Sequence, residues 1–469
     1  MTINSENSLA LLAFNIGVNQ FDINRGLAYI SMRDQVLRAR TLIAAAEGAK
    51  LFELRTGEPD GDDDEPVDYD VTVLGAGVGG ISIALAAVEK NLRTLVIDKN
   101  DSCFALLRSG TDRLVSTTLY DWPARHFNAH AFPKLPGITS PAMTDNFILK
   151  FPDQAIAADQ LALHLQKQVE KLSKKHANLL QFAHGVTISD RKAISLPAGR
   201  CVLVNSPKPL PRLSGTDSTQ ISTRILVYAF GFGSEKVMTL PAADINASFW
   251  GYRSLEADLD QLRKTSTERG LVSIQGAGDG GLQEALRFAF GPKHQDFASV
   301  VAMLEAMVAP KFPQWESMLR DIMLAEDNAA RAYMWGYSQE LVFETVETTH
   351  QTLIDALLTT VPEQIALWYS TVGRQQQLDI TVYDKHAFSG RVYALNRFLF
   401  KLLLTLTKQQ NRMVQVNRSA FDLPEKAVGI KVNRSGLAQI HRAMGTGNKA
   451  DYLRRATLRA IPNQYGVVG

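Results

Sequence analysis

Hydrophobic and polar positions alternate along the chain in a way that separates helical from stranded stretches. Over residues 1–56, most clearly in GLAYISMRDQVLRARTLIAAAEGAKLF, apolar residues recur at helical spacing, which predicts a helical N-terminal segment. Eight carboxylates and two prolines then fall between Glu58 and Asp70. Because like charges at this density repel one another and extend the chain, residues 57–69 are expected to form an acidic linker.

From residue 70 the pattern predicts a strand–helix–strand unit. DYDVTVLGAGVGG has the pattern of a buried strand that enters a glycine turn, ISIALAAVEKN that of a helix, and RTLVIDK that of a second strand. An amphipathic helix around AADQLALHLQKQVEKLSKK follows, with short strand candidates near LLQFAHGVTI, RCVLVNS and STRILVYAFGFG. Residues 70–235 are therefore assigned to one α/β domain.

A second glycine turn, in IQGAGDGGLQEALRF, lies within residues 236–430. Over about residues 292–377 the pattern becomes helical and rich in methionine and tryptophan, and a clear strand follows at LDITVYDK. We predict a second strand–turn–helix unit that carries a helical insertion. Residues 431–469 are expected to form a C-terminal segment that could return to the first domain.

Composition narrows the class of protein. Hydrophobic residues make up 45% of the chain and charged residues 21%, as in ordinary globular proteins. The net charge of +2, from 50 basic and 48 acidic residues, argues against a nucleic-acid binder. Only Cys103 and Cys201 occur, far apart, which excludes a CxxC dithiol and fits a reducing compartment. With no signal peptide pattern and no run of 18 apolar residues, we expect a soluble cytoplasmic protein that does not contact membranes.

The first glycine turn has the spacing that dinucleotide binding requires. Gly75 permits a tight turn, Gly77 lets the backbone approach a pyrophosphate, and Gly80 permits close packing of helix and strand. Asp98 ends the second strand, 18 residues beyond Gly80, where an acid accepts hydrogen bonds from a ribose. The predicted cofactor-binding residues of this turn are Gly75, Ala76, Gly77, Gly79, Gly80, Asp98 and Lys99.

This stretch resembles the N-terminal FAD-binding motif of flavoproteins with two dinucleotide-binding domains, such as thioredoxin reductases and flavin-containing monooxygenases. Members usually carry Glu where Asp98 stands. ILVYAFGFGSEK is similar to the strand of these proteins that ends beside the flavin, with Gly231 in its small-residue turn. The resemblance implies FAD as cofactor. It also implies an α/β fold with two Rossmann-like dinucleotide-binding units, a helical insertion in the second and a helical N-terminal segment.

The second glycine turn is similar to the second motif of thioredoxin-reductase-like enzymes, which implies a site for NAD or NADP. Its residues are Gly276, Gly278, Asp279 and Gly281. A carboxylate repels phosphate, so Asp279 is expected to point away, either capping the helix or meeting the flavin side. The next acid at a strand end is Asp384, 103 residues after Gly281 rather than roughly 20. Either a helical block is inserted here, or the turn no longer holds a nicotinamide cofactor.

A cluster of functional side chains follows the first unit, in LVSTTLYDWPARHFNAHAFP. In flavoproteins of this type, a segment at this place in the chain lines the flavin. Trp122 could stack on the ring, and Asp121 or His126 could exchange a proton near neutral pH. The alternative is a structural loop whose turn is fixed by proline. The catalytic candidates are Tyr120, Asp121, Trp122 and His126, and no metal site is predicted.

These motifs favour an FAD-dependent oxidoreductase. Two nucleotide turns without a dithiol point to an NAD(P)H-dependent, monooxygenase-like enzyme acting on a small or apolar substrate. One alternative is a flavin oxidase or dehydrogenase of an amine or amino acid, in which the second turn is structural. Another is a non-catalytic dinucleotide-binding or scaffold protein. The N-terminal helices and the helical insertion are candidate surfaces for a homo-oligomer or a partner protein.

Overall fold

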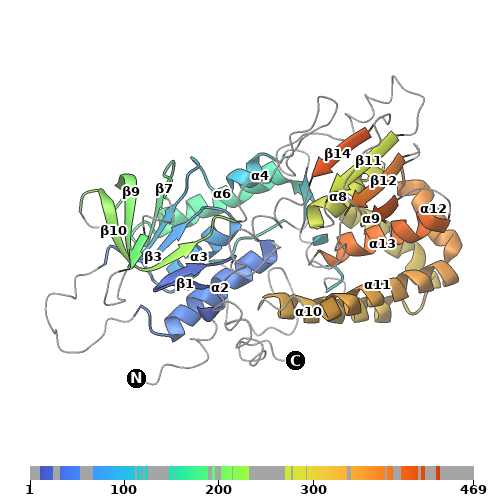
Figure 1. Cartoon of the computed structure of the whole chain (residues 1–469), viewed down its shortest axis with the longest axis horizontal. Helices are drawn as coiled ribbons and strands as arrows, with labels where there is room; N and C mark the ends of the chain where they lie inside the picture. The colour runs from blue at the N-terminus through green and yellow to red at the C-terminus, as the bar shows by residue number, and fades with distance from the viewer. Residues whose placement is uncertain are drawn as a thin grey trace.

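Two β-sheets with parallel strands lie at opposite ends of the molecule, each accompanied by helices (Figure 1). The structure is a computed structural model. It describes residues 11–24, 32–52, 67–110, 113–116, 118–119, 122–124, 147–152, 154–188, 193–195, 202–213, 215–231, 270–275, 278–291, 293–334, 340–374, 378–383, 392–409, 414–417 and 429–433.

The first sheet has the strand order β1-β2-β10-β3-β4-β7, and from β2 to β7 all neighbours are parallel. β8 and β9 form an antiparallel extension from β10. β4 is buried throughout and β3 almost throughout, as expected of parallel strands covered on both faces. The strands are β1 (Asn15–Gly17), β2 (Gln20–Asp22), β3 (Tyr69–Leu74), β4 (Thr94–Ile97), β7 (Leu180–Ala183), β8 (Ala193–Ser195), β9 (Val202–Leu210) and β10 (Ser218–Tyr228).

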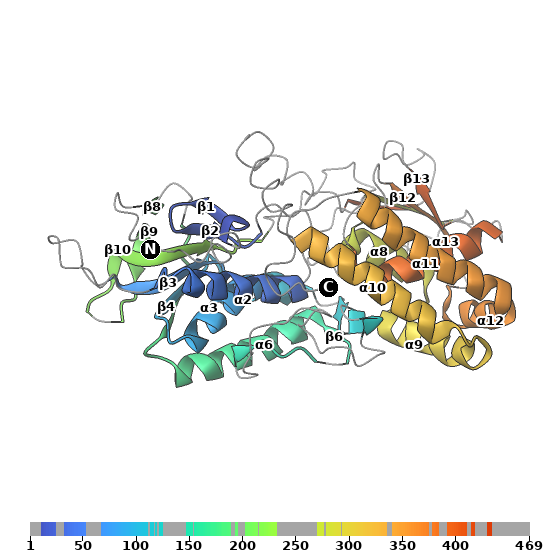
Figure 2. The same cartoon turned by 90° about the horizontal axis from the view of Figure 1, so that it is seen from below.

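Helix α3 follows β3 directly and is buried along nearly its whole length, which its small and apolar residues VGGISIALAAV permit. Helix α2 packs against α3. Helix α6 lies in the same part of the molecule and packs against α4 (Figure 2). The helices and short strands of this part are α2 (Met32–Gly48), α3 (Val78–Glu89), α4 (Ala105–Arg108), β5 (Leu114–Val115), β6 (Ile156–Ala157) and α6 (Ala158–Lys175).

The prediction of a wholly helical N-terminal segment is wrong in part. Residues 11–52 contribute α2, but also β1 and β2, and β2 pairs in parallel with β10, with Gln20 opposite Leu226. Strands of three residues are too short to show an alternating pattern, and β10, the second partner of β2, lies some two hundred positions further along the chain. The sequence pattern therefore showed only the helix.

The second sheet has the order β13-β12-β11-β14, with all neighbours parallel. β12 lies directly beside β11, with Ile274 opposite Val382, although a long stretch of chain separates them. This order, with helices between β11 and β12 and between β12 and β13, is that of a Rossmann-like half. The elements are β11 (Gly270–Gln275), α8 (Asp279–Ala289), β12 (Leu378–Tyr383), α13 (Ala394–Gln409), β13 (Val414–Asn417) and β14 (Gly429–Asn433).

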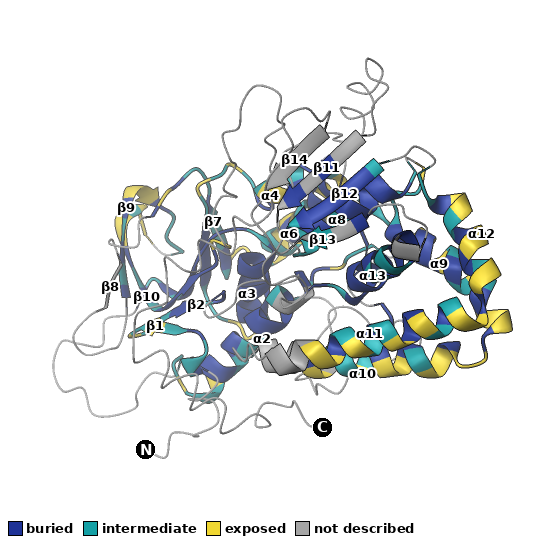
Figure 3. Ribbon diagram, turned by 45° about the vertical axis from the view of Figure 1, so that its right-hand side comes forward, coloured by how far each residue is buried: buried dark blue, intermediate teal, exposed yellow. Residues whose placement is uncertain are grey.

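Helices occupy the chain between α8 and β12, and α10 and α11 lie side by side (Figure 2). Their outward faces are exposed, whereas α8 and β12 are buried (Figure 3). Trp315 and Trp368 belong to the core, and Trp368 Nε1 donates a 3.1 Å hydrogen bond to the Val300 carbonyl. The elements are α9 (Phe297–Val308), η4 (Ala309–Lys311), α10 (Trp315–Met334), α11 (Glu340–Thr360) and α12 (Pro362–Val372).

A single hydrophobic cluster runs through both α/β parts. It contains Val71 and Val73 of the first sheet and Ile274 and Val382 of the second. Within the described ranges, no helix is both long enough and apolar enough to cross a membrane. Most of the predicted acidic linker and nearly all of residues 431–469 lie outside the described residues.

Candidate dinucleotide-binding site

The fold itself demands two glycines of the first turn. Gly75 follows β3 with a φ of +113°, and a Cβ at this position would lie 2.5 Å from the Ala229 carbonyl oxygen of the chain leaving β10. A Cβ on Gly80 would lie only 1.8 Å from the Gly75 carbonyl oxygen. Both contacts involve backbone, which cannot move aside. Without a side chain, Gly75 packs directly against the backbone at the end of β10, and Gly80 of α3 packs directly against the backbone of the turn.

Gly77 differs, because a Cβ there would meet no atom within 4 Å. Its backbone is extended, at φ −76° and ψ −173°, so any residue could adopt it. Within the described chain, the N–H groups of Gly77 and Val78 have no hydrogen-bond partner. Open space, two free donors and the positive end of α3 are what a dinucleotide pyrophosphate requires. The residues present therefore fit this part of FAD.

Asp98 is fixed against the same turn. Its Oδ2 accepts a hydrogen bond of 2.5 Å from the Ala76 N–H, and its Oδ1 accepts two from Asn100, at 2.7 and 2.8 Å. A carboxylate offers about four acceptor positions, so these bonds leave one for a ribose hydroxyl. Lys99, next along the chain, is exposed. Contact of Asp98 and Lys99 with a cofactor stays a prediction.

The end of β10 adjoins the turn. The Ala229 N–H donates a 2.8 Å hydrogen bond to the Leu74 carbonyl, which places residues 229–231 at the carboxyl edge of the sheet. Gly231 has a φ of +70°, the left-handed region that glycine tolerates best. Phe230 beside it is 51% exposed and makes an edge-on contact with Tyr228. Ligands of open parallel sheets bind at this edge.

In the second turn, the structure describes Gly278, Asp279 and Gly281, whereas Gly276 lies outside the described residues, as does Asp384. Asp279 begins α8 but does not cap it. Instead, its Oδ1 accepts hydrogen bonds from the Tyr393 N–H, at 2.7 Å, and from Asn396 Nδ2, at 2.9 Å. The carboxylate thus holds the beginning of α13. Sequence reasoning could not find these partners, because they lie more than a hundred residues away.

Of the catalytic candidates, Tyr120, Asp121 and His126 lie outside the described residues. Trp122 is buried and stacks on Phe398 of α13, with ring centres 5.0 Å apart. Its Nε1 donates a 3.1 Å hydrogen bond to Glu305 Oε1 on α9. These contacts give Trp122 a structural place between the two α/β parts, and its role at a flavin stays a prediction.

A buried ion pair also joins the two parts, and the sequence patterns did not indicate it. Arg113, which precedes β5, is 3% exposed, and Glu284 of α8 is fully buried. Arg113 Nη2 lies 2.5 Å from Glu284 Oε1, and Nη1 lies 3.3 Å from Oε2. A charged residue on the apolar face of a helix, as in LQEALRF, is the signal that could have marked Glu284.

Two buried titratable groups bear on the chemistry. Burial raises the pKa of the Cys103 thiol to about 12, and the negative charge of Asp98 adds to this shift. Cys103 is therefore a protonated, unreactive thiol at neutral pH. Burial lowers the pKa of His350, although its 2.9 Å hydrogen bond with Glu326 opposes the shift. Within the described ranges, no group of three or more His, Cys, Asp or Glu side chains could hold a metal ion.

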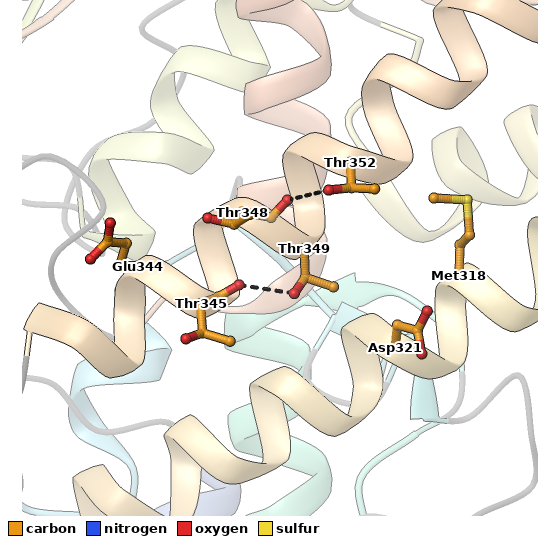
Figure 4. A pocket seen from close by; sticks show the side chains of 7 residues that line it. All are labelled: Met318, Asp321, Glu344, Thr345, Thr348, Thr349 and Thr352. Atoms are coloured by element: carbon orange, nitrogen blue, oxygen red, sulfur yellow. Dashed lines mark hydrogen bonds between the residues drawn. The ribbon is translucent and has the colours of Figure 1, made fainter.

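A pocket of about 510 Å³ lies between α10 and α11, in a different part of the chain from both glycine turns (Figure 4). Two of its threonine hydroxyls bond to carbonyls of their own helix, Thr349 to Thr345 and Thr352 to Thr348. These two hydroxyls have therefore used their donor protons within the helix. The lining residues are Met318, Asp321, Glu344, Thr345, Thr348, Thr349 and Thr352.

A parallel α/β fold with glycine turns at two strand–helix junctions defines a class, the dinucleotide-binding proteins. A family model described as pyridine nucleotide-disulphide oxidoreductase matches residues 69–328, more than half of the chain. The chain belongs to this family. Membership confirms the expected superfamily, FAD-dependent oxidoreductases with two dinucleotide-binding domains, and FAD as its cofactor.

Solved structures align with parts of the chain. The thioredoxin reductase of Lactococcus lactis is 14% identical over 46% of this chain and 52% of its own, with a TM-score of 0.25. A flavin monooxygenase from Stenotrophomonas maltophilia is 15% identical over 46% and 53%, with a TM-score of 0.27. The bacillithiol disulfide reductase Bdr from Staphylococcus aureus is 11% identical over 82% and 79%, at 0.34. The chain thus spans about half the length of the first two, and similarity at this level does not extend to function. No curated protein sequence matches the chain.

Proposed function

We propose that the protein is an FAD-dependent oxidoreductase that takes electrons from a nicotinamide cofactor and acts, like a monooxygenase, on a small or apolar substrate. The observation that carries the proposal is the open face of Gly77, with two free backbone donors beside it. FAD, when bound, supplies the redox chemistry. The chain supplies the cradle at Gly77, an acceptor for ribose at Asp98, and the rigid turn held by Gly75 and Gly80.

The second α/β part is the candidate site for NADH or NADPH. β11 leads into α8 as β3 leads into α3, and the neighbouring strands are parallel in both parts. The helices α9 to α12 are then an insertion between α8 and β12, which accounts for the long separation of Gly281 from Asp384. On this proposal the inserted helices do not disturb the turn, because β12 still lies directly beside β11.

The cysteines favour a monooxygenase-like reaction over disulphide reduction. A dithiol reductase needs two neighbouring thiols of which one ionises readily. This chain has Cys103 and Cys201, 98 positions apart in the sequence. Cys103 is buried, and its raised pKa keeps it protonated. A disulphide substrate would find no reactive partner in Cys103.

One observation favours a second candidate, a flavin oxidase or dehydrogenase of an amine or amino acid. The carboxylate of Asp279 is committed to the beginning of α13 through Tyr393 and Asn396. A turn that serves to anchor a helix has a structural role without any nicotinamide cofactor. In that case electrons would reach FAD directly from the substrate.

Two measurements test these functions. The purified protein should show flavin absorption or take up FAD to give it, and a colourless protein that cannot be reconstituted contradicts both candidates. Anaerobic mixing with NADH or NADPH should then bleach the flavin spectrum. A yellow protein that neither nicotinamide bleaches leaves the oxidase or dehydrogenase as the better function.

A further inference from the structure

The N-terminal helix α2 touches the first glycine turn through one side chain. Gln35 Oε1 accepts a hydrogen bond of 3.0 Å from the Gly79 N–H, in the first turn of α3. A Cβ on Gly79 would lie 3.2 Å from the same oxygen, so the Gln35 amide rests directly on the turn. The open face of Gly77 is two residues away.

This hydrogen bond determines how the amide is oriented. An N–H can be accepted only by the amide oxygen, so the NH₂ group of Gln35 lies on the opposite side of the amide carbon. No residue in the described ranges accepts a hydrogen bond from it. The Gly79 N–H is thus occupied by Gln35, and the NH₂ group of Gln35 keeps two N–H donors available. The Gly79 N–H that Gln35 accepts lies in the same turn as Gly77 and Val78, whose N–H groups are free within the described chain.

Helix α2 is held firmly enough to fix this side chain. Arg40 pairs with Glu89 of α3 at 2.5 Å, and both groups are largely buried. Arg38 Nε donates a 2.7 Å hydrogen bond to the Ile23 carbonyl, and its guanidinium lies 4.6 Å from the centre of the Phe14 ring. The helix is thus tied both to α3 and to the residues around β2, before any ligand binds.

We propose that Gln35 is a cofactor-positioning residue, whose NH₂ group donates a hydrogen bond to the pyrophosphate of the dinucleotide at the first glycine turn. This inference rests on the proposed binding of FAD there. Gln35 adds an uncharged donor to the backbone donors, on the side of the turn that faces α2. Residues 11–52 are then part of the binding unit rather than an appended segment.

Gln35→Glu tests the proposal. Glutamate keeps an oxygen that can accept the Gly79 N–H, removes both donors and adds a negative charge beside the phosphate. The Kd for FAD, measured by titrating flavin fluorescence with apoprotein, should rise at least about tenfold. The urea midpoint of the apoprotein should not fall, because a carboxylate at a helix N-terminus is favourable. Gln160→Glu, the same change on the exposed surface of α6, is the matched control and should leave the Kd unchanged.

A neutral variant separates the donor from the added charge. Gln35→Met should raise the Kd for FAD severalfold, and the Kd for ADP, which carries the pyrophosphate without the flavin, should rise in parallel. Unchanged FAD affinity in Gln35→Glu overturns the proposal, and so does unchanged FAD affinity in Gln35→Met. If the wild-type protein binds neither FAD nor ADP, the proposed function fails too. If the wild-type protein binds FAD and both variants bind it with the same Kd, only the role proposed for Gln35 is contradicted.

Discussion

The two glycine turns share a strand–turn–helix design and differ in where their carboxylate points. In the first turn, Asp98 comes from the neighbouring strand and accepts the Ala76 N–H, which leaves Gly77 and Val78 free. In the second, the carboxylate of Asp279 lies on the helix itself and holds the beginning of α13. The same local motif can therefore leave its donors open for a ligand or contribute a helix-to-helix contact. The spacing of glycines alone does not distinguish the two.

The largest effect is expected when a charge enters the open face of the first turn. Gly77→Asp should lower FAD affinity by roughly a hundredfold or more, because two like charges about 4 Å apart repel by about 4 kcal/mol at an effective dielectric of 20. The apoprotein should remain folded, since the new Cβ meets no atom within 4 Å. FAD titration and urea unfolding measure the two quantities.

Gly278→Asp makes the corresponding change in the second turn. Gly278 has φ −74° and ψ 179° at the N-cap of α8, a position that favours Asp. FAD binding should be unaffected, and bleaching by NADH or NADPH should be lost if that turn holds a nicotinamide. If Gly77→Asp and Gly278→Asp lowered the FAD affinity equally, the prediction that only the first turn binds FAD would be wrong.

The next effect concerns the ion pair that joins the two parts. Arg113→Met removes the guanidinium that pairs with the fully buried Glu284 carboxylate, which should lower the free energy of unfolding by about 3–5 kcal/mol. Urea denaturation measures it. The double variant Arg113→Met, Glu284→Leu should recover much of the loss. Lys90→Met breaks a pair that is 41% and 48% exposed, and its cost should stay below about 1 kcal/mol.

A smaller effect is expected at Asp279. Asp279→Ala removes the acceptor for the Tyr393 N–H and for Asn396, and should lower the free energy of unfolding by about 1–2 kcal/mol. The FAD affinity should remain at the wild-type value, and Asp279→Asn, which keeps an acceptor oxygen, should lose less stability. A marked loss of FAD from Asp279→Ala would mean that this carboxylate serves the flavin rather than α13.

The smallest effect is a pH dependence of the free energy of unfolding that comes from His350 of α11. Burial lowers the pKa of His350 below its ordinary value of 6.5, so below that pH the unfolded chain binds a proton that the folded protein resists. Stability contributed by neutral His350 is present above pH 6.5 and decreases as the pH falls below it. His350→Gln should flatten this part of a stability–pH curve. An unchanged slope in His350→Gln would contradict the assignment.

Local patterns predicted local structure well. The strands β3, β4 and β12 and the helix α3 follow from runs such as VTVL and LDITVY, whose hydrophobic spacing is complete within one element. The roles of Gly75 and Gly80 followed from the same spacing, and the structure supplies their reason in two backbone contacts.

Apart from the short pairing of β1 with β2, the missed features are long-range. β2 pairs with a strand two hundred positions away, Arg113 pairs with Glu284 across 171 positions, and Asp279 bonds to Asn396 across 117. None of these partners is specified by the residues around it, because the pairing depends on how the elements pack. A buried Glu within an apolar helix face indicates that some partner exists, but does not identify it.

The pairing of β2 with β10 also constrains the order of events during synthesis. β2 is made early, but the strand that completes its pairing ends only at Tyr228. The described strands of the first sheet are all present by that residue, before β11 begins at Gly270. The first sheet can therefore close on the ribosome while the second is still unmade, and until then the N-terminal strand has no edge to join. The contact between Arg113 and Glu284 can form only after Glu284 has been made, when every described strand of the first sheet is already present.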